Sequence, residues 1–286
     1  MEWFKSFSWL FIELAFLFIG ISFLVNLLQG FIPFEKIERK LVGSNKWVGG
    51  LFALIFAFVT PFCSCSTIPI IVNMLKRKFP FGVVMVFLFA SPLLDPTIIS
   101  VMGFMLGWKV ALIYTILTSI FSYAIGFLLE KWGLETQVKN VTISGYEEKE
   151  HAFSLKEAWA ETFQLMKTVL PYLLLGAVIG ATIKNLVPME WMANTFGTDG
   201  WWLVPIAAIL GIPLYIRLAS MIPISTILIG KGMALGPVMA LLISSAGASL
   251  PEVMLLHSIF KKKLVYLFIL SVVSMATMSG FLFYLI

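Results

Sequence analysis

The sequence predicts an all-α polytopic membrane protein with two inverted structural repeats, each containing a re-entrant or hairpin segment and a broken transmembrane helix. Three observations support this fold class. Apolar residues make up 60% of the 286 residues and charged residues only 12%, and the mean hydropathy is +0.98. The second half of the chain repeats the first at a constant offset. The Lys and Arg residues gather on one side of the predicted spans.

The composition leaves too little polar surface to cover a soluble globule, so lipid is the expected solvent. The net charge is only +5, and the cations lie in short blocks between apolar runs. Such blocks anchor and orient membrane helices, so no nucleic-acid partner is expected. The first apolar run, 7–28, is longer than the core of a secretory signal and is followed by no small-residue cleavage site. We expect it to remain as a transmembrane helix.

The two halves of the chain match when one is shifted by 154 positions. The matches include Trp47 with Trp201, Gly82 with Gly236, Ser91 with Ser245, Lys109 with Lys263 and Gly126 with Gly280. They predict a first transmembrane repeat at 1–132, a cytoplasmic linker at 133–154, and a second repeat at 155–286 with an amphipathic lead-in. Duplicated halves of this kind are typical of transporters.

Each repeat consists of a long apolar helix, two apolar stretches interrupted near their middles, and a final helix. The uninterrupted helices are expected at 7–28, 110–130, 169–187 and 264–286. Pro and polar residues mark the interruptions, at 60–69, 91–96, 213–223 and 244–251. A membrane crossing needs about 20 residues, and the pieces beside each interruption are shorter. They are therefore half-helices or the arms of a hairpin.

The distribution of cations decides between these two arrangements. If 47–75 and 201–230 are hairpins while 81–108 and 233–260 cross, fifteen flanking cations lie on one face and four on the other. The positive-inside rule then places the linker in the cytoplasm and both termini outside the cell (inner) membrane. The same arrangement inverts the second repeat. Non-helical chain inside a membrane needs protein or water around it, so the interruptions are expected to cluster.

Two cysteines, Cys63 and Cys65, lie one residue apart in the tip of the first predicted hairpin. Ser66 or Thr67 is a candidate N-cap for the returning arm, and a helix start lowers the cost of a thiolate. The pair is therefore a candidate site for a soft metal or metalloid, such as Cu(I), Hg(II) or trivalent arsenic. The alternative is that both cysteines pack as small apolar side chains.

Asp95 lies in the second interruption, between Leu94 and Pro96. A carboxylate inside a membrane is costly unless it is paired or protonated, which makes Asp95 a candidate for proton exchange. It is equally suited to cap a half-helix that begins at Pro96 or Thr97. The two roles are compatible.

Arg217 lies in the second hairpin tip, at the position that the repeat aligns with Cys63. Its permanent charge needs an anionic partner, backbone carbonyls or water. Glu252, a second candidate for proton exchange, is the nearest acidic residue by architecture, and Asp95 is the other. The sequence leaves open whether Arg217 forms a structural ion pair or binds an anionic group of a substrate.

The candidate substrate site combines the polar residues of the four interruptions. It comprises Cys63, Ser64, Cys65, Ser66, Thr67, Ser91, Asp95, Arg217, Ser220, Ser245, Ser249 and Glu252. The sequence contains no Ser–His–acid set, no phosphate-binding loop with Lys and no zinc-binding His pair. We therefore expect neither an enzyme nor a cofactor. The energy for transport would come from an ion gradient or from the gradient of the substrate.

The chain resembles a known family in the runs TPFCSCS at 60–66 and SPLLDP at 91–96 and in its polar central loop. It is similar over nearly its whole length to the ArsP-like predicted permeases, the domain of unknown function 318 group. The resemblance implies efflux of trivalent organoarsenicals. It also implies that Cys63 and Cys65 are the thiols that meet the arsenic.

These observations predict a permease that works by alternating access around the interrupted segments. The expected partners are a small-molecule substrate and the lipid bilayer, and a homo-oligomer is left open. One alternative is a permease for an unrelated small solute. Another is a membrane thiol oxidoreductase that cycles Cys63 and Cys65 between dithiol and disulfide. A single intervening residue strains that ring, and the sequence offers no apparent quinone or haem site.

Overall fold

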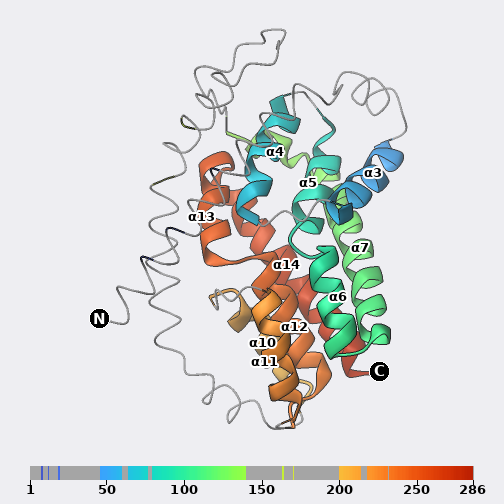
Figure 1. Cartoon of the computed structure of the whole chain (residues 1–286). Helices are drawn as coiled ribbons and strands as arrows, with labels where there is room; N and C mark the ends of the chain where they lie inside the picture. The colour runs from blue at the N-terminus through green and yellow to red at the C-terminus, as the bar shows by residue number, and fades with distance from the viewer. Residues whose placement is uncertain are drawn as a thin grey trace.

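A computed structural model describes residues 46–59, 64–76, 79–139, 200–213, 218–230 and 232–285, and the single positions 8, 12, 19, 163 and 170. Helices dominate these residues, which contain no strand (Figure 1), so the all-α class is confirmed. Apart from these single positions, the predicted helices at 7–28 and 169–187 lie outside the described residues, as does most of the linker. The elements are α3 (Lys46–Val59), α4 (Ser64–Lys76), α5 (Phe81–Ala90), α6 (Pro96–Met105), α7 (Trp108–Lys131), η1 (Leu134–Gln137), α10 (Leu203–Gly211), α11 (Leu218–Gly230), α12 (Leu235–Gly247), α13 (Leu250–Ile259) and α14 (Lys262–Tyr284).

Two of the described helices, α7 and α14, are long and apolar enough to cross a membrane. They correspond to the helices predicted at 110–130 and 264–286. A third span results if Leu235–Gly247 and Glu252–Ile259, which are bent by 42° relative to each other, act as one. The membrane class is confirmed to this extent.

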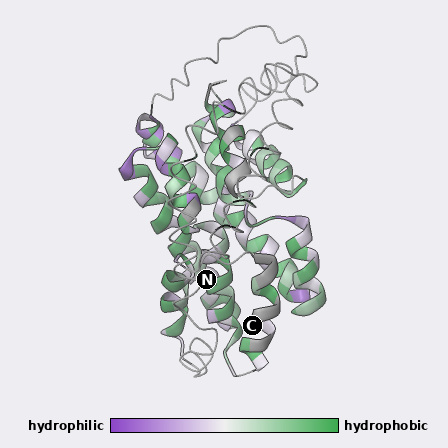
Figure 2. Ribbon diagram, turned by 60° about the vertical axis from the view of Figure 1, so that its left-hand side comes forward, coloured by the Kyte–Doolittle hydropathy of each residue, from purple (hydrophilic) through white to green (hydrophobic). Residues whose placement is uncertain are grey.

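The outer face of α7 is apolar and its inner face carries hydroxyls. Leu112, Ile116 and Ile120, spaced four residues apart, are exposed. Tyr114 and Thr118, spaced in the same way on the opposite face, are buried. Apolar residues run along most of the helices, and polar residues are confined to short stretches (Figure 2). This is the reverse of a soluble amphipathic helix and is typical of a helix that faces lipid.

The offset of 154 residues recurs in the helix starts. In the second unit α11, α12, α13 and α14 begin 154 residues after α4, α5, α6 and α7, respectively. The packing recurs as well, because α5 packs on α7 and α3 as α12 packs on α14 and α10. The sequence repeat therefore corresponds to a repeat of helices.

Paired glycines produce the same close helix crossing in both units. A Cβ added at Gly126 of α7 would lie 3.0 Å from the carbonyl oxygen of Gly82 in α5. A Cβ at Gly280 of α14 would lie 3.0 Å from the carbonyl oxygen of Gly236 in α12. Helices in lipid are held by such close packing, because burial from water contributes little between them.

Each unit packs one of its helices on a helix of the other unit. The α4 helix of the first unit packs on α13 of the second, and α11 of the second packs on α6 of the first. In Figure 1, α3, α4, α5 and α13 lie toward one end of the molecule, and α6, α10, α11 and α12 lie toward the other. The long helices α7 and α14 contact each other between these ends.

Three of the predicted interruptions contain residues that are helical in the structure. The α4 helix begins at Ser64 and continues through Pro69, and α11 runs from Leu218 through Pro223. Likewise, α12 continues to Gly247, so Ser244 and Ser245 are helical. A proline six residues into a helix removes only one backbone hydrogen bond, which neighbouring helices can compensate. The predicted N-cap at Ser66 or Thr67 was therefore wrong, since both lie inside α4.

The start of the linker binds the second unit. We call residues 133–139 the strap. Val138 forms an isolated antiparallel bridge with Phe260, which lies between α13 and α14. The Lys139 N–H donates to the Ile259 carbonyl at 2.8 Å, and the Lys261 N–H donates to the Gln137 carbonyl at 2.9 Å. The strap thus joins the end of α7 to the corner between α13 and α14.

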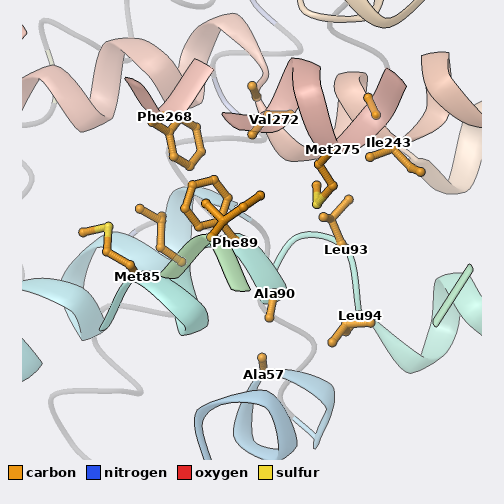
Figure 3. Close-up of a cluster of buried hydrophobic side chains, with 14 of the residues drawn as sticks. Ala57, Met85, Phe89, Ala90, Leu93, Leu94, Ile243, Phe268, Val272 and Met275 are labelled. Atoms are coloured by element: carbon orange, nitrogen blue, oxygen red, sulfur yellow. The ribbon is translucent and has the colours of Figure 1, made fainter. Parts of the chain in front are cut away.

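The core lies around α5 and α12. Every residue of α5 is buried, and so is α12 from Gly236 to Ser245. Figure 3 shows Phe89 of α5 facing Phe268 of α14, and the rings are stacked with centroids 4.9 Å apart. Leu93, just beyond α5, points toward Met275 of α14 in the same view. The start of the second interruption, residues 91–94, is therefore packed inside the molecule and not at its edge.

Candidate functional site

The structure describes half of the predicted site residues in full. Thr67, Ser91, Asp95, Ser245, Ser249 and Glu252 are described with their side chains. Ser64, Cys65 and Ser66 belong to α4 and Ser220 to α11, but their side chains lie outside the description. Cys63 and Arg217 lie outside the described residues. The pairing of Arg217 with Asp95 or Glu252 therefore stays a prediction.

A hydroxyl pair joins α4 to the first break, which we define as residues 91–95. The Thr67 Oγ1 lies 3.0 Å from the Ser91 Oγ, and both side chains are buried. Ser91 is also the C-cap of α5, and its N–H donates to the Phe87 carbonyl. The α4 helix is thus bonded to the point where α5 ends.

Asp95 caps α6. Its side-chain oxygen accepts a hydrogen bond of 2.8 Å from the Thr97 N–H, and Pro96 occupies the first helical position. This confirms the capping role expected from the sequence. Proton exchange by Asp95 stays a prediction.

A further side-chain hydrogen bond reaches the first break, and it was not predicted from the sequence. The Tyr114 hydroxyl of α7 donates to the Leu93 carbonyl at 2.9 Å, and the tyrosine is fully buried. The 154-residue offset aligns Tyr114 with Phe268, so the first unit has a hydroxyl that the second unit lacks at this position. This extra hydroxyl inside a membrane helix could have indicated the hydrogen bond, because a buried Tyr O–H usually has a partner.

The second break, which we define as residues 248–249, lies between α12 and α13. Ser249 and Glu252 are buried, and only 1% of Glu252 is exposed. Glu252 lies in the first turn of α13, where a helix start favours negative charge. Ser245 is also buried, and its hydroxyl donates to the Leu242 carbonyl one turn earlier in α12.

The two breaks are neighbours. A Cβ added at Gly247, the last residue of α12, would lie 3.8 Å from Cδ1 of Leu93. The α4 helix, which is bonded to the first break through Thr67, packs on α13, which follows the second break. The α11 helix packs on α6, which follows the first break. The contacts thus connect all four segments in which interruptions were predicted.

Buried polar side chains are concentrated in this region. Of the ten buried polar or charged residues in the described part of the chain, six come from α4, the two breaks and the adjoining turns of α12 and α13. They are Thr67, Ser91, Ser244, Ser245, Ser249 and Glu252. The region combines hydroxyls, a buried carboxylate and helix ends in an otherwise apolar interior, a combination suited to binding a small polar or ionisable solute.

Among the described residues, no three or more His, Cys, Asp and Glu side chains are placed to hold a metal ion. Cys63 and the side chain of Cys65 are not among them. The proposed role of Cys63 and Cys65 toward a soft metal or metalloid therefore stays a prediction.

Comparison with known proteins identifies the family. The sequence model of the ArsP_1 family, described as predicted permeases, matches residues 3–285 of the chain. The chain belongs to this permease family. The UPF0718 protein YraQ of Escherichia coli is 27% identical to the permease over 243 residues, which cover 85% of this chain and 69% of that protein.

Two further relatives of the permease are more distant. The UPF0718 protein MJ0584 of Methanocaldococcus jannaschii is 23% identical over 307 residues, covering 85% of this chain and 84% of that protein. A Streptococcus mutans protein named a putative two-component membrane permease complex subunit is 23% identical over 262 residues, covering 88% and 82%. No solved structure matches the permease.

Proposed function

We propose that this permease exports a small thiophilic solute, such as a trivalent organoarsenical, from the cytoplasm across the cell (inner) membrane. It would do so by alternating access around the region where the two breaks meet. One observation carries the proposal. Buried polar side chains gather at α4 and the breaks of a protein whose long helices are apolar on the outside. Burying a polar group at membrane depth costs free energy unless protein, water or a solute forms hydrogen bonds with it.

The proposed roles follow from the positions of the residues along the chain. Cys63 and Cys65 flank Ser64, the first residue of α4, where the positive end of the helix favours thiolates. They contact the soft centre of the solute. Asp95 and Glu252 exchange protons, and Arg217 completes the second half of the site.

Removal of both thiols tests the proposal. Cys63 and Cys65 are the only cysteines, so the double substitution Cys63→Ser with Cys65→Ser yields a cysteine-free permease. Sensitive cells that express it should accumulate methylarsenite to the level of cells without the permease. The control is Ser225→Ala, which removes a different buried hydroxyl, bonded at 2.8 Å to the Met221 carbonyl of its own helix. Export by the cysteine-free permease at the normal rate removes the cysteines from the mechanism.

The inverted arrangement has its own test. Lys109 and Lys263 occupy equivalent positions of the repeat, near the starts of α7 and α14, and both are exposed. Inverted units place them on opposite sides of the membrane, whereas parallel units place them on the same side. In the cysteine-free background, a membrane-impermeant maleimide added outside should label Lys109→Cys and leave Lys263→Cys unlabelled. Equal labelling of the two positions contradicts the inversion.

A further inference from the structure

The hydroxyl of Tyr114 holds the middle of the first break. It donates to the Leu93 carbonyl at 2.9 Å from a fully buried position in α7. Ser91 and Asp95, both predicted to contact solute or proton, lie two residues before and two residues after Leu93. The bond between Thr67 and Ser91 and the cap from Asp95 to Thr97 hold the two ends of the same break.

The second unit shows that the helix arrangement does not require this hydroxyl. Phe268 occupies the position equivalent to Tyr114, and Gly247 the position equivalent to Leu93. Phe268 stacks on Phe89, and α14 still packs on α12 as α7 packs on α5. The aromatic ring is common to both units, whereas the hydroxyl serves the first break alone.

We propose that Tyr114 is a positioning residue of the permease, which keeps Ser91 and Asp95 in the places where they act on the solute. The inference rests on the proposed function. A carbonyl in a non-helical segment at membrane depth has no water to bind, so the tyrosine supplies the missing donor. Without that donor the buried acceptor is left unsatisfied, which the break relieves by changing shape.

A matched pair of substitutions separates this role from a general loss of a hydrogen bond. Tyr123 lies on the same helix, and its hydroxyl also donates at 2.9 Å to a backbone carbonyl, that of Trp47 in the first turn of α3. We expect Tyr114→Phe and Tyr123→Phe to be obtained in the same amount as the unaltered chain. Tyr114→Phe should raise the half-saturating methylarsenite concentration roughly tenfold, the effect of leaving one buried acceptor without a donor. Tyr123→Phe should leave it within about twofold of normal, because its hydrogen bond is exposed and lies away from the breaks.

A second measurement needs no solute. The N–H groups of Leu93 and Leu94 both donate to the Ala90 carbonyl, at 3.1 and 2.9 Å. Tyr114→Phe should speed hydrogen exchange at these amides, and Tyr123→Phe should not. Suppose that Tyr114→Phe exchanges faster but the unaltered permease transports no methylarsenite. That result supports the role of Tyr114 in fixing the shape of the break, and it overturns the proposed solute. Unaltered exchange with unaltered half-saturation overturns the positioning role.

Discussion

The described parts of the first unit, within residues 46–132, and of the second unit, within residues 200–285, have equivalent helices but differ in their polar contacts. The glycine crossings at 82 with 126 and at 236 with 280 are equivalent. The breaks are not. Asp95 caps α6 through its side chain, whereas the equivalent Ser249 makes no side-chain hydrogen bond to cap α13.

The corners before the long helices differ as well. In the second unit the strap pairs with Phe260, between α13 and α14. The equivalent corner of the first unit contains Leu106 and Gly107, and Gly107 has a φ of +99°, a conformation that glycine adopts without strain. The comparison indicates that a duplicated membrane fold keeps the close packing that holds it together. Its polar groups are then able to diverge toward different tasks in the two units.

The largest expected effect comes from filling the repeated crossings. Gly126→Leu and Gly280→Leu should each destabilise the permease by about 3 kcal/mol or more, because the facing backbone cannot yield easily. The yield of monodisperse protein in detergent measures this. Gly230→Leu is the control, since a Cβ there meets no atom within 4 Å. A severe effect at only one of the two crossings contradicts their equivalence.

The strap should form a disulfide with the corner before α14 and not with the equivalent corner before α7. In the cysteine-free background, Val138→Cys with Phe260→Cys should oxidise readily to a disulfide, because paired residues of an antiparallel bridge bring their Cβ atoms close. The closed loop should add about 2 kcal/mol of stability, seen as a higher melting temperature that reductant reverses. Val138→Cys with Leu106→Cys, the equivalent corner, should stay reduced. Oxidation of both pairs to the same extent shows that the strap does not choose between the corners.

The sequence predicted well the two long helices that the structure describes, and it predicted the interruptions less well. The helices expected at 110–130 and 264–286 run from 108 to 131 and from 262 to 284. Membrane thickness sets the length that a crossing helix needs, so the length of the apolar run in the sequence is enough to predict it. Pro69 and Pro223 suggested longer interruptions, but both lie inside helices. Whether a proline ends a helix depends on the tertiary contacts around it, which a local pattern does not contain.

The site was predicted in part, for a similar reason. The Asp95 cap was expected because an N-cap depends only on its own helix start. The bond from Thr67 to Ser91 and that from Tyr114 to Leu93 join residues 24 and 21 positions apart. Such contacts depend on how the helices pack, so the repeat could indicate Tyr114 as an exception but could not identify its partner.

The caps of the two breaks should differ in strength. Asp95→Ala should cost about 1 kcal/mol, the usual value of an N-cap, and Ser249→Ala close to nothing. Thermal unfolding in detergent measures both. Asp95→Asn keeps a side-chain oxygen as acceptor and should therefore keep the stability. If Asp95 also exchanges a proton, that variant loses the pH dependence of methylarsenite export. An equal loss of stability in Asp95→Ala and Ser249→Ala contradicts the difference between the breaks.

The smallest expected effect belongs to an ion pair that the second unit lacks. The Lys46 Nζ lies 2.6 Å from Glu130 Oε1, whereas the equivalent positions hold Gly200 and Tyr284. Because 65% of the Lys46 side chain is exposed, Lys46→Ala should cost less than about 1 kcal/mol, and less still at high salt. Glu130 raises the pKa of Lys46 above its usual 10.5. The contribution is therefore complete below pH 10.5 and is lost as the pH rises through the raised pKa. The difference in melting temperature between Lys46→Ala and the unaltered chain should therefore be constant from pH 6 to pH 9. If that difference varies within this range, another group titrates together with the ion pair.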